Sequence, residues 1–352
     1  MNIHFTKGGM SLILNNLSDI IKEDIATINP KKIIINTSSQ PNSKPHLGTL
    51  TTLMTAFALA EKFQLEFKIP TMVRFDELEN SPYEINKPYY ISLGDFKFDN
   101  GNSIADNNMK TYIEIFEKLK KITGVSYEIR TYKEFQEIDV IRENLIKILK
   151  APNNFDKYLN PSNASTYIRT KCPICNISYF TPKMIIDRDN IKFEAKCPEH
   201  GHYHTILTKD NKDYIDMNTQ LRDVLKGVHI AKEKEDFILE IMCDGSDWSG
   251  EWTSNVHYKT MLALGFNCIT TRFFTPTIVD ATGGKFSKSV YLKKDSYDGD
   301  ERLFADYKLF YNKYKEEGWI KIFNEVKKWV NEPMRFFRSY SWEYIKYVLE
   351  KE

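Results

Sequence analysis

Two short segments of the chain carry residue types that bind phosphate groups. His46 and Gly48 follow a short apolar run and open an apolar-periodic stretch, which is the strand–loop–helix order of a nucleotide-binding α/β unit. At the start of a helix, a histidine and unpaired backbone N–H groups can donate to phosphate oxygens. Lys285 and Lys288 lie much further along the chain, in a loop that follows two glycines. Together the two segments predict a site for a triphosphate.

These donors fit an attack on the α-phosphate of ATP, which spreads negative charge over the transition state and releases pyrophosphate. We expect His46 to donate to the phosphates. Gly48 would let the nucleotide come close to the chain, because glycine has no Cβ. Lys285 and Lys288 would close over the β- and γ-phosphates. Further hydroxyl donors in the same loop are Ser287 and Ser289.

A second constellation has the spacing of metal ligands. Cys172 and Cys175 form a C-x2-C pair, and Cys197 and His200 form a C-x2-H pair further along. Thiolates and imidazoles in such short pairs are typical of tetrahedral Zn²⁺, and four protein ligands leave no position for a substrate. We therefore expect a structural zinc site. The alternative fourth ligands are His202 and His204.

Length and composition describe an ordinary globular protein. The chain has 352 residues, of which 41% are hydrophobic and 28% charged. Its net charge of +1 argues against a wholly basic nucleic-acid-binding protein, although a local basic patch stays possible. No secretory signal opens the chain, and no apolar run approaches the roughly 20 residues that span a bilayer. We expect a cytoplasmic protein that does not enter the membrane.

Strand-like and helix-like segments alternate, which predicts an α/β fold with a parallel sheet. Strands are expected at 32–36, 67–75, 126–130, 237–243 and 268–274, and helices at 12–29, 48–63, 107–123, 133–150, 221–235 and 251–264. The Pro- and Gly-rich stretch 81–105 is expected to be a surface excursion. The expected units are 1–150 and 216–295 as two halves of the main domain, 151–215 as an inserted zinc-ribbon-like module, and 296–352 as a short helical region.

The pair of phosphate-binding segments resembles two signature elements of class I aminoacyl-tRNA synthetases. The HIGH element is present as PHLGT at 45–49, and the KMSKS element as KFSKS at 285–289. The zinc module and the turn Asp-Gly-Ser-Asp-Trp at 244–248 look most like class I lysyl-tRNA synthetases. The resemblance covers roughly residues 31–292.

The resemblance implies a Rossmann-like catalytic domain that activates an amino acid with ATP and Mg²⁺ and passes it to the 3′ end of a tRNA. Gly245 and Asp247 would then lie against the ribose or the amino acid; Asp247 as a simple turn residue is the alternative. Three features depart from the family. Thr49 replaces the second histidine, Phe286 replaces methionine, and the segment after Ser289 is too short for the family's anticodon-binding domain. Residues implied to touch the nucleotide are Pro45, His46, Gly48, Thr49, Gly245, Asp247, Lys285, Ser287, Lys288 and Ser289.

The resemblance implies lysine as the first amino acid to consider, and acidic side chains could hold its ammonium group or could be simple surface charges. The acidic candidates are Asp76, Glu77, Asp244, Glu251 and Asp280. The acceptor is expected to be the acceptor stem of a tRNA; the alternatives are a non-tRNA acceptor, or a non-catalytic protein that senses an amino acid or tRNA. Basic and aromatic residues near the C-terminus could touch nucleic acid or form a packed face: Lys327, Lys328, Trp329, Arg335, Arg338, Tyr340, Trp342 and Lys346. The sequence does not indicate an oligomeric state.

Overall fold

The computed structural model describes residues 14–86, 88–159, 168–187, 190–267, 270–286 and 299–351. The expectations for Ser287, Lys288 and Ser289, and for Cys268 in a strand, lie outside the described residues.

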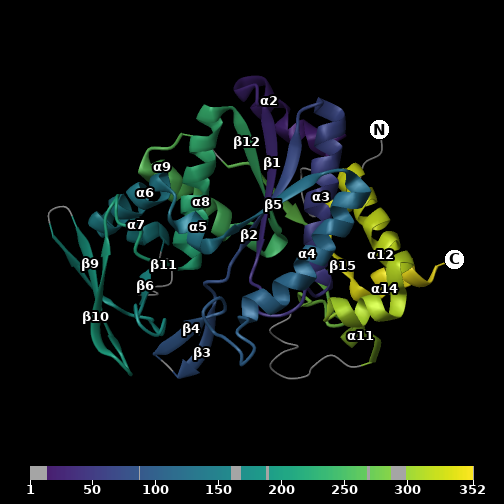
Figure 1. Cartoon of the computed structure of the whole chain (residues 1–352). Coiled ribbons are helices and arrows are strands. Elements are labelled where there is room, and N and C mark those ends of the chain that lie inside the picture. Colours follow the sequence, from purple (N-terminus) through teal and green to yellow (C-terminus); the bar gives the residue numbers. More distant parts are fainter. Residues whose placement is uncertain are drawn as a thin grey trace.

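A five-stranded sheet in which all neighbouring strands are parallel forms the centre of the molecule (Figure 1). Its strands are β1 (Lys32–Ser39), β2 (Thr71–Glu77), β5 (Ser126–Thr131), β12 (Ile238–Gly245) and β13 (Arg272–Thr275). Their order across the sheet is β13-β12-β1-β2-β5, which is the doubly wound order with the first strand in the middle. The structure therefore confirms an α/β fold with a parallel sheet.

The two faces of the sheet are covered by different helices (Figure 1). On one side lie α3 (Leu47–Phe67) and α4 (Ile104–Thr123), and on the other α8 (Thr219–Glu233) and α9 (Lys259–Leu264). Because side chains alternate along a strand, the α3 side receives apolar residues of the strands, while Arg74, Asp76 and Glu240 point to the α8 side and are buried there.

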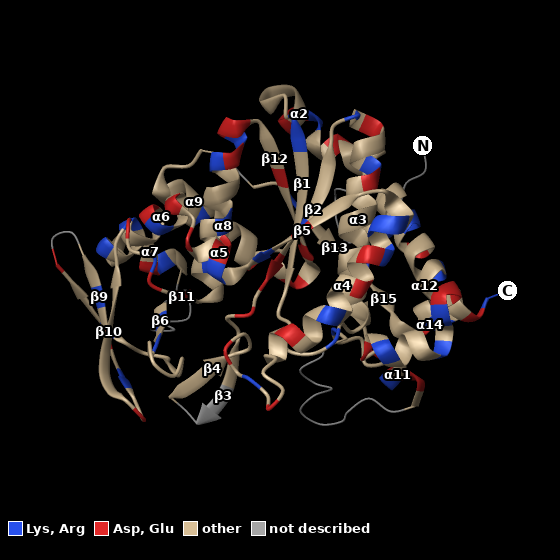
Figure 2. Cartoon of the chain, in the orientation of Figure 1, with Lys and Arg blue, Asp and Glu red and all other residues tan. Residues whose placement is uncertain are grey.

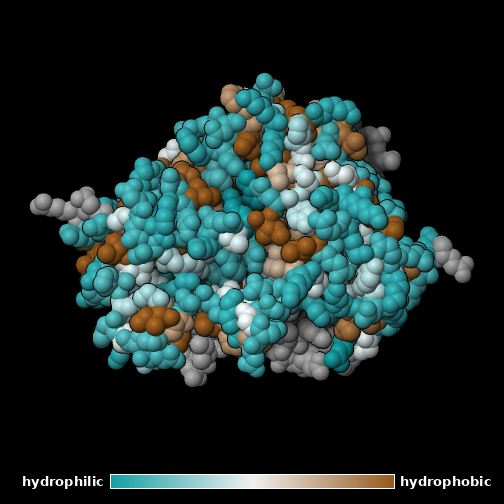
Figure 3. Space-filling model, in the orientation of Figure 1, coloured by the Kyte–Doolittle hydropathy of each residue, from teal (hydrophilic) through white to brown (hydrophobic). Residues whose placement is uncertain are grey.

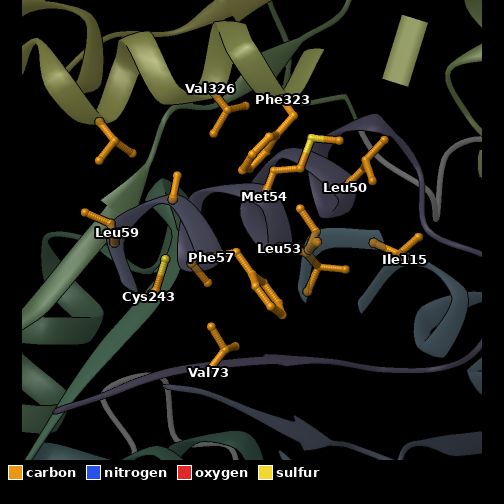
Figure 4. Packing of buried hydrophobic residues seen from close by; sticks show 14 of the residues in the cluster. Leu50, Leu53, Met54, Phe57, Leu59, Val73, Ile115, Cys243, Phe323 and Val326 are labelled. Carbon is orange, nitrogen blue, oxygen red and sulfur yellow. The ribbon is translucent and has the colours of Figure 1, made fainter. Parts of the chain in front are cut away.

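Helix α3 is buried around most of its circumference, as Figure 4 shows for its contacts with the sheet and with helix α12 (Tyr307–Asn331). Leu53, Met54, Phe57 and Leu59 are at most 1% exposed. A helix that is apolar all round is stable only when other elements enclose it. The helices after residue 298 supply the outer layer.

The C-terminal segment is thus part of the main hydrophobic core. It comprises α11 (Gly299–Leu303), α12, α13 (Pro333–Phe336), β15 (Tyr340–Ser341) and α14 (Trp342–Glu350). Trp319 and Trp329 are fully buried, and Trp329 Nε1 donates to Glu325. The sequence left two interpretations of the C-terminal aromatic residues, contact with nucleic acid or a packed face. Trp329 and Tyr340 are buried and belong to a packed face.

Backbone hydrogen bonds join this segment to the first phosphate-binding segment and to the strand that precedes the second. The N–H of Tyr307 donates to the carbonyl of Pro45 at 2.9 Å, and the N–H of Leu47 donates to the carbonyl of Phe304 at 2.8 Å. Strand β15 pairs in parallel with β14 (Ile278–Val279), which lies just before Lys285. The C-terminal segment therefore holds the backbone on both sides of the candidate site.

Two antiparallel sheets form a separate lobe at the lower left of Figure 1. The larger one has the order β11-β6-β7-β4-β3, with β3 (Pro82–Asn86), β4 (Tyr89–Ser92), β6 (Ile168–Lys171), β7 (Ser178–Tyr179) and β11 (Asp216–Met217). The smaller one contains β8 (Lys183–Ile186), β9 (Ile191–Cys197) and β10 (Gly201–Leu207). The stretch at 81–105 thus contributes strands to a sheet that it shares with the cysteine-containing segment.

Several element boundaries differ from the expected ones. Strand β2 begins at Thr71 because α3 continues to Phe67 and ends at Lys68 in the left-handed conformation, with φ of 59°. The helix expected at 133–150 is divided into α5 (Tyr132–Gln136) and α6 (Asp139–Lys150), since Ile138 between them is extended. The remaining elements are η1 (Leu17–Ile21), α2 (Lys22–Ile28), α7 (Pro152–Leu159), η2 (Lys234–Asp236), η3 (Ser246–Trp248) and the π-helical η4 (Trp252–Tyr258).

The surface in view is mainly hydrophilic, with hydrophobic side chains in separate groups (Figure 3), and charges of both signs are interspersed over the elements (Figure 2). Among the described helices, none combines the length and the apolar character needed to cross a membrane.

Replacing Trp329 by alanine should lower the free energy of unfolding by about 3–5 kcal/mol, because it leaves a cavity in the core shared by α3 and α12. Chemical denaturation measures this change. Tyr347→Ala is the control, because Tyr347 is 59% exposed and its loss should change stability by less than about 0.5 kcal/mol. Equal stabilities of the two variants would show that the C-terminal helices are not part of this core.

Candidate active site and metal centre

A cleft opens at the carboxyl ends of β1, β12 and β13, next to the start of α3. The connection after β1 runs through α3 on one face of the sheet, while α8, which precedes β12, lies on the other face. The gap between two such strands is the place where open α/β sheets bind ligands. The cleft is lined by Ser38, Ser39, His46, Gly48, Thr49, Thr52, Leu53, Gly245, Ser246, Asp247, Trp248, Thr275, Pro276, Thr277, Ile278, Lys285 and Phe286.

His46 is the N-cap residue of α3. Its backbone is extended, and its Nδ1 accepts a hydrogen bond of 3.0 Å from the N–H of Gly48. Nδ1 is therefore the unprotonated nitrogen, and the ring proton resides on Nε2. This tautomer makes Nε2 the donor nitrogen of His46, a residue that lines the cleft.

Gly48 is required by the position of the His46 ring. A Cβ at Gly48 would lie 2.8 Å from His46 Cε1 and 3.2 Å from Nδ1, closer than real Cβ atoms come to such neighbours. A larger residue would push the imidazole aside. The sequence predicted that Gly48 makes room for a nucleotide, and the structure adds that it makes room for the histidine.

The first N–H groups of α3 are less available than expected. The N–H of Leu47 donates to Phe304 and that of Gly48 to His46. Among the described residues, the N–H of Thr49 has no acceptor. The helix start therefore offers a ligand the N–H of Thr49 together with the positive end of the helix dipole.

Lys285 lines the same cleft as His46. Its ammonium lies 2.8 Å from Asp247 Oδ2, with both side chains about half exposed. A Cβ at Gly245 would lie 2.6 Å from Asp247 Oδ1, so Gly245 makes room for the carboxylate that binds this lysine. Exposed pairs of this kind contribute little to stability and can open when another anion competes for the lysine.

The structure thus brings together His46, Gly48, Thr49, Gly245, Asp247 and Lys285, which are far apart in the sequence. Pro45 is placed differently. It lines a smaller cavity against the C-terminal segment, and its carbonyl accepts from Tyr307. Sequence reasoning missed Thr275 and Thr277 and named Ser246 and Trp248 only as members of the turn at 244–248, although all four lie at or within three residues of the ends of strands β12 and β13. Position at a strand's carboxyl end was the signal that could have found them.

The four predicted metal ligands form one cluster. The Sγ atoms of Cys172, Cys175 and Cys197 and a ring nitrogen of His200 all lie within 4.8 Å of one another. Cys175 Sγ is 3.5 Å from Cys197 Sγ, and His200 Nδ1 is 3.6 Å from Cys197 Sγ. Sulfur ligands of tetrahedral zinc lie about 3.8 Å apart. The donor set and its spacing therefore fit a structural Zn²⁺.

His202 and His204 do not belong to this cluster. Both lie on β10 with exposed side chains, and the described four-ligand group contains neither. Geometry thus favours His200 as the fourth ligand.

Metal analysis of purified protein should find one zinc per chain, and Cys197→Ser should lose it, because three ligands bind Zn²⁺ less tightly than four. His200→Ala should weaken zinc retention against a chelator, whereas His204→Ala, the matched control, should retain zinc as the unmodified protein does. Equal retention by the His200 and His204 variants would contradict the assignment.

Two of the five acidic side chains considered for a basic substrate are already engaged. Asp76 lies 2.7 Å from Lys226 Nζ and 2.8 Å from Arg130 Nε. Burial by itself would raise the pKa of the Asp76 carboxyl, but Lys226 and Arg130 outweigh it and hold that pKa well below its usual value. Asp280 accepts from Thr282 and Gly284 within its own loop. These two carboxylates are therefore poorly placed to bind a substrate cation.

Glu77 and Asp244 differ from them because each is protonated more readily. Burial, with the neighbouring Glu79 second, raises the pKa of Glu77 to about 7. Burial also raises the pKa of Asp244, against the attraction of Arg272. Glu251 is exposed.

Comparison with known proteins gives only distant likenesses. No family model matches the chain, and no curated protein matches it. Among solved structures, the glutamate-tRNA synthetase of Elizabethkingia anophelis aligns with 90% of this chain and 70% of its own, at 12% identity and a TM-score of 0.42. A protein assigned as an arginyl-tRNA synthetase of Campylobacter jejuni aligns with 77% of this chain and 62% of its own, at 11% identity and a TM-score of 0.31. Similarities at this level do not establish a shared function.

Proposed function

We propose that the chain activates the carboxylate of an amino acid with ATP and passes the activated acyl group to the 3′ end of a tRNA. The observation that carries the proposal is the cleft itself. It lies at the switch point of the sheet, and both His46 and Lys285 line it. Resemblance of their two segments to the class I synthetase signatures supports the same chemistry.

In the proposed reaction, a carboxylate oxygen of the amino acid attacks the α-phosphorus of ATP. The bond between the α-phosphorus and the bridging oxygen breaks, and pyrophosphate leaves. His46 Nε2 and the N–H of Thr49 would donate to the α-phosphate oxygens as their charge grows. Lys285 would leave Asp247 for the β- and γ-phosphates, whose counter-ion would be Mg²⁺. Lys288 is proposed for the same role from its place in the sequence.

The identity of the amino acid and of the acceptor are finer parts of the proposal. Lysine is the amino acid favoured by the resemblance, although the pairing of Asp76 with two cations gives it little geometric support. A tRNA acceptor stem is the acceptor favoured by the resemblance. Charges of both signs are interspersed over the elements drawn in Figure 2, so a tRNA would bind to a local basic patch.

Exchange of labelled pyrophosphate into ATP, dependent on an amino acid, tests the activation step. We expect exchange with at least one of the twenty amino acids, and a loss of about 100- to 1,000-fold in His46→Ala, because a donor to the transition state is removed. Lys285→Ala and Lys288→Ala should also lower the rate.

Lys110→Ala is the matched control, because Lys110 is an exposed lysine on α4, outside the cleft. Its rate should equal that of the unmodified protein. ATP binding with no exchange for any amino acid would overturn catalysis and favour a sensor. Exchange without attachment of the amino acid to RNA, in a reaction with total tRNA, would point to another acceptor.

A further inference from the structure

A second cavity adjoins the nucleotide cleft on the α8 side of the sheet. Ser38 and Trp248 line both spaces, so the two share a wall. The other residues of this second cavity come from β12, from α8 and from the segments beside them: Leu78, Thr219, Arg222, Asp223, Lys226, Met242 and Asp244.

Two of the charged groups in this cavity are fully engaged with the protein. Lys226 donates to Asn36 at 2.9 Å and pairs with Asp76 at 2.7 Å. Asp223 accepts from Arg272 at 2.8 Å and lies 2.9 Å from His257 Nδ1. These pairs hold α8 against the sheet.

Arg222 differs from them. It is only 8% exposed, it lines this cavity and a smaller one beside Tyr132, and its guanidinium has no hydrogen bond or ion pair within the described part of the chain. A guanidinium with so little exposure has lost most of its hydration, so an anion that reached it through the cavity would stabilise it. Its planar fork of N–H groups matches a carboxylate with two parallel hydrogen bonds.

Asp244 supplies the complementary group at the end of β12. Its Oδ2 is buried and accepts no hydrogen bond, although Arg272 Nη1 lies 3.5 Å away. The Asp244 side chain as a whole is 12% exposed, so its other oxygen can accept from an ammonium group in the cavity. One cavity thus presents an unpaired cation and an incompletely paired anion, next to the site where a carboxylate would meet ATP.

We propose that this cavity selects an amino acid with a carboxylate side chain, which Arg222 binds. The inference rests on the proposed function, since the α-carboxylate must point into the nucleotide cleft to be activated. The α-ammonium group would then bind Asp244. The side chain would extend toward α8, where Arg222 is the cation left for it. Lysine fits this arrangement poorly, because its ammonium group would meet Arg222 and Lys226.

The test compares glutamate, aspartate, glutamine and lysine, first by calorimetric binding without ATP and then by pyrophosphate exchange. We expect binding and exchange with glutamate or aspartate. In Arg222→Gln the KM for that amino acid should rise by about 100-fold, because a buried charge pair is lost. The KM for ATP should be unchanged, and Arg222→Lys should restore part of the affinity.

Arg338→Gln is the control, because Arg338 is an exposed arginine far from the cavity in sequence and is not among its lining residues. It should leave both KM values unchanged. Exchange with lysine and not with the acidic amino acids overturns the inference and leaves the proposed function intact. A rise in the KM for ATP in Arg222→Gln also overturns it, since Arg222 would then bind phosphate. Binding of glutamate or aspartate that depends on Arg222, without any exchange, supports the pocket and overturns the proposed function.

Discussion

The burial of α3 is the constraint on which the candidate site depends. This helix is enclosed by the central sheet on one side and by α12 on the other (Figure 4), so neither its direction nor its starting point can shift freely. Its N-cap is His46, and the preceding and following backbone groups are bound by Tyr307 and Phe304. The imidazole therefore stands at the carboxyl edge of β1 because hydrophobic packing elsewhere fixes the helix that carries it.

Much of the central fold could be predicted from the sequence. The buried strands are short apolar runs such as 33–35, and alternation with amphipathic helices indicates a parallel sheet. The extents of the helices and strands were harder to predict. Phe67, for example, is of a residue type that favours strands, yet it is the last residue of α3. The pairing of β4 with β7 was not predictable, since it joins segments about 90 residues apart through very short strands. The role of Trp329 depended on tertiary packing, which helical spacing alone does not reveal.

The residues of the candidate sites also divide into those that could be proposed from the sequence and those that could not. The motif residues His46, Gly48 and Lys285 could be proposed from the sequence because their types and spacing are specific, and the four candidate metal ligands because their short pairs are. Arg222 was missed because a single arginine on a helix is normally an exposed one. What distinguishes Arg222 is that it is buried without a partner in the described part of the chain. This can be recognised only when the positions of its neighbours are known. Asp76 was misjudged for the reverse reason, because its two cationic partners come from β5 and α8.

The central claim is that the cleft between β1 and β12 joins a carboxylate to the α-phosphate of ATP. Mass spectrometry of a single turnover with ATP, Mg²⁺, an acidic amino acid and hydroxylamine tests it most directly, because hydroxylamine traps an acyl-adenylate as a hydroxamate. The account predicts amino-acid hydroxamate and AMP in equal amounts, both formed about 100- to 1,000-fold more slowly with His46→Ala. Release of ADP, or AMP without hydroxamate, would contradict it.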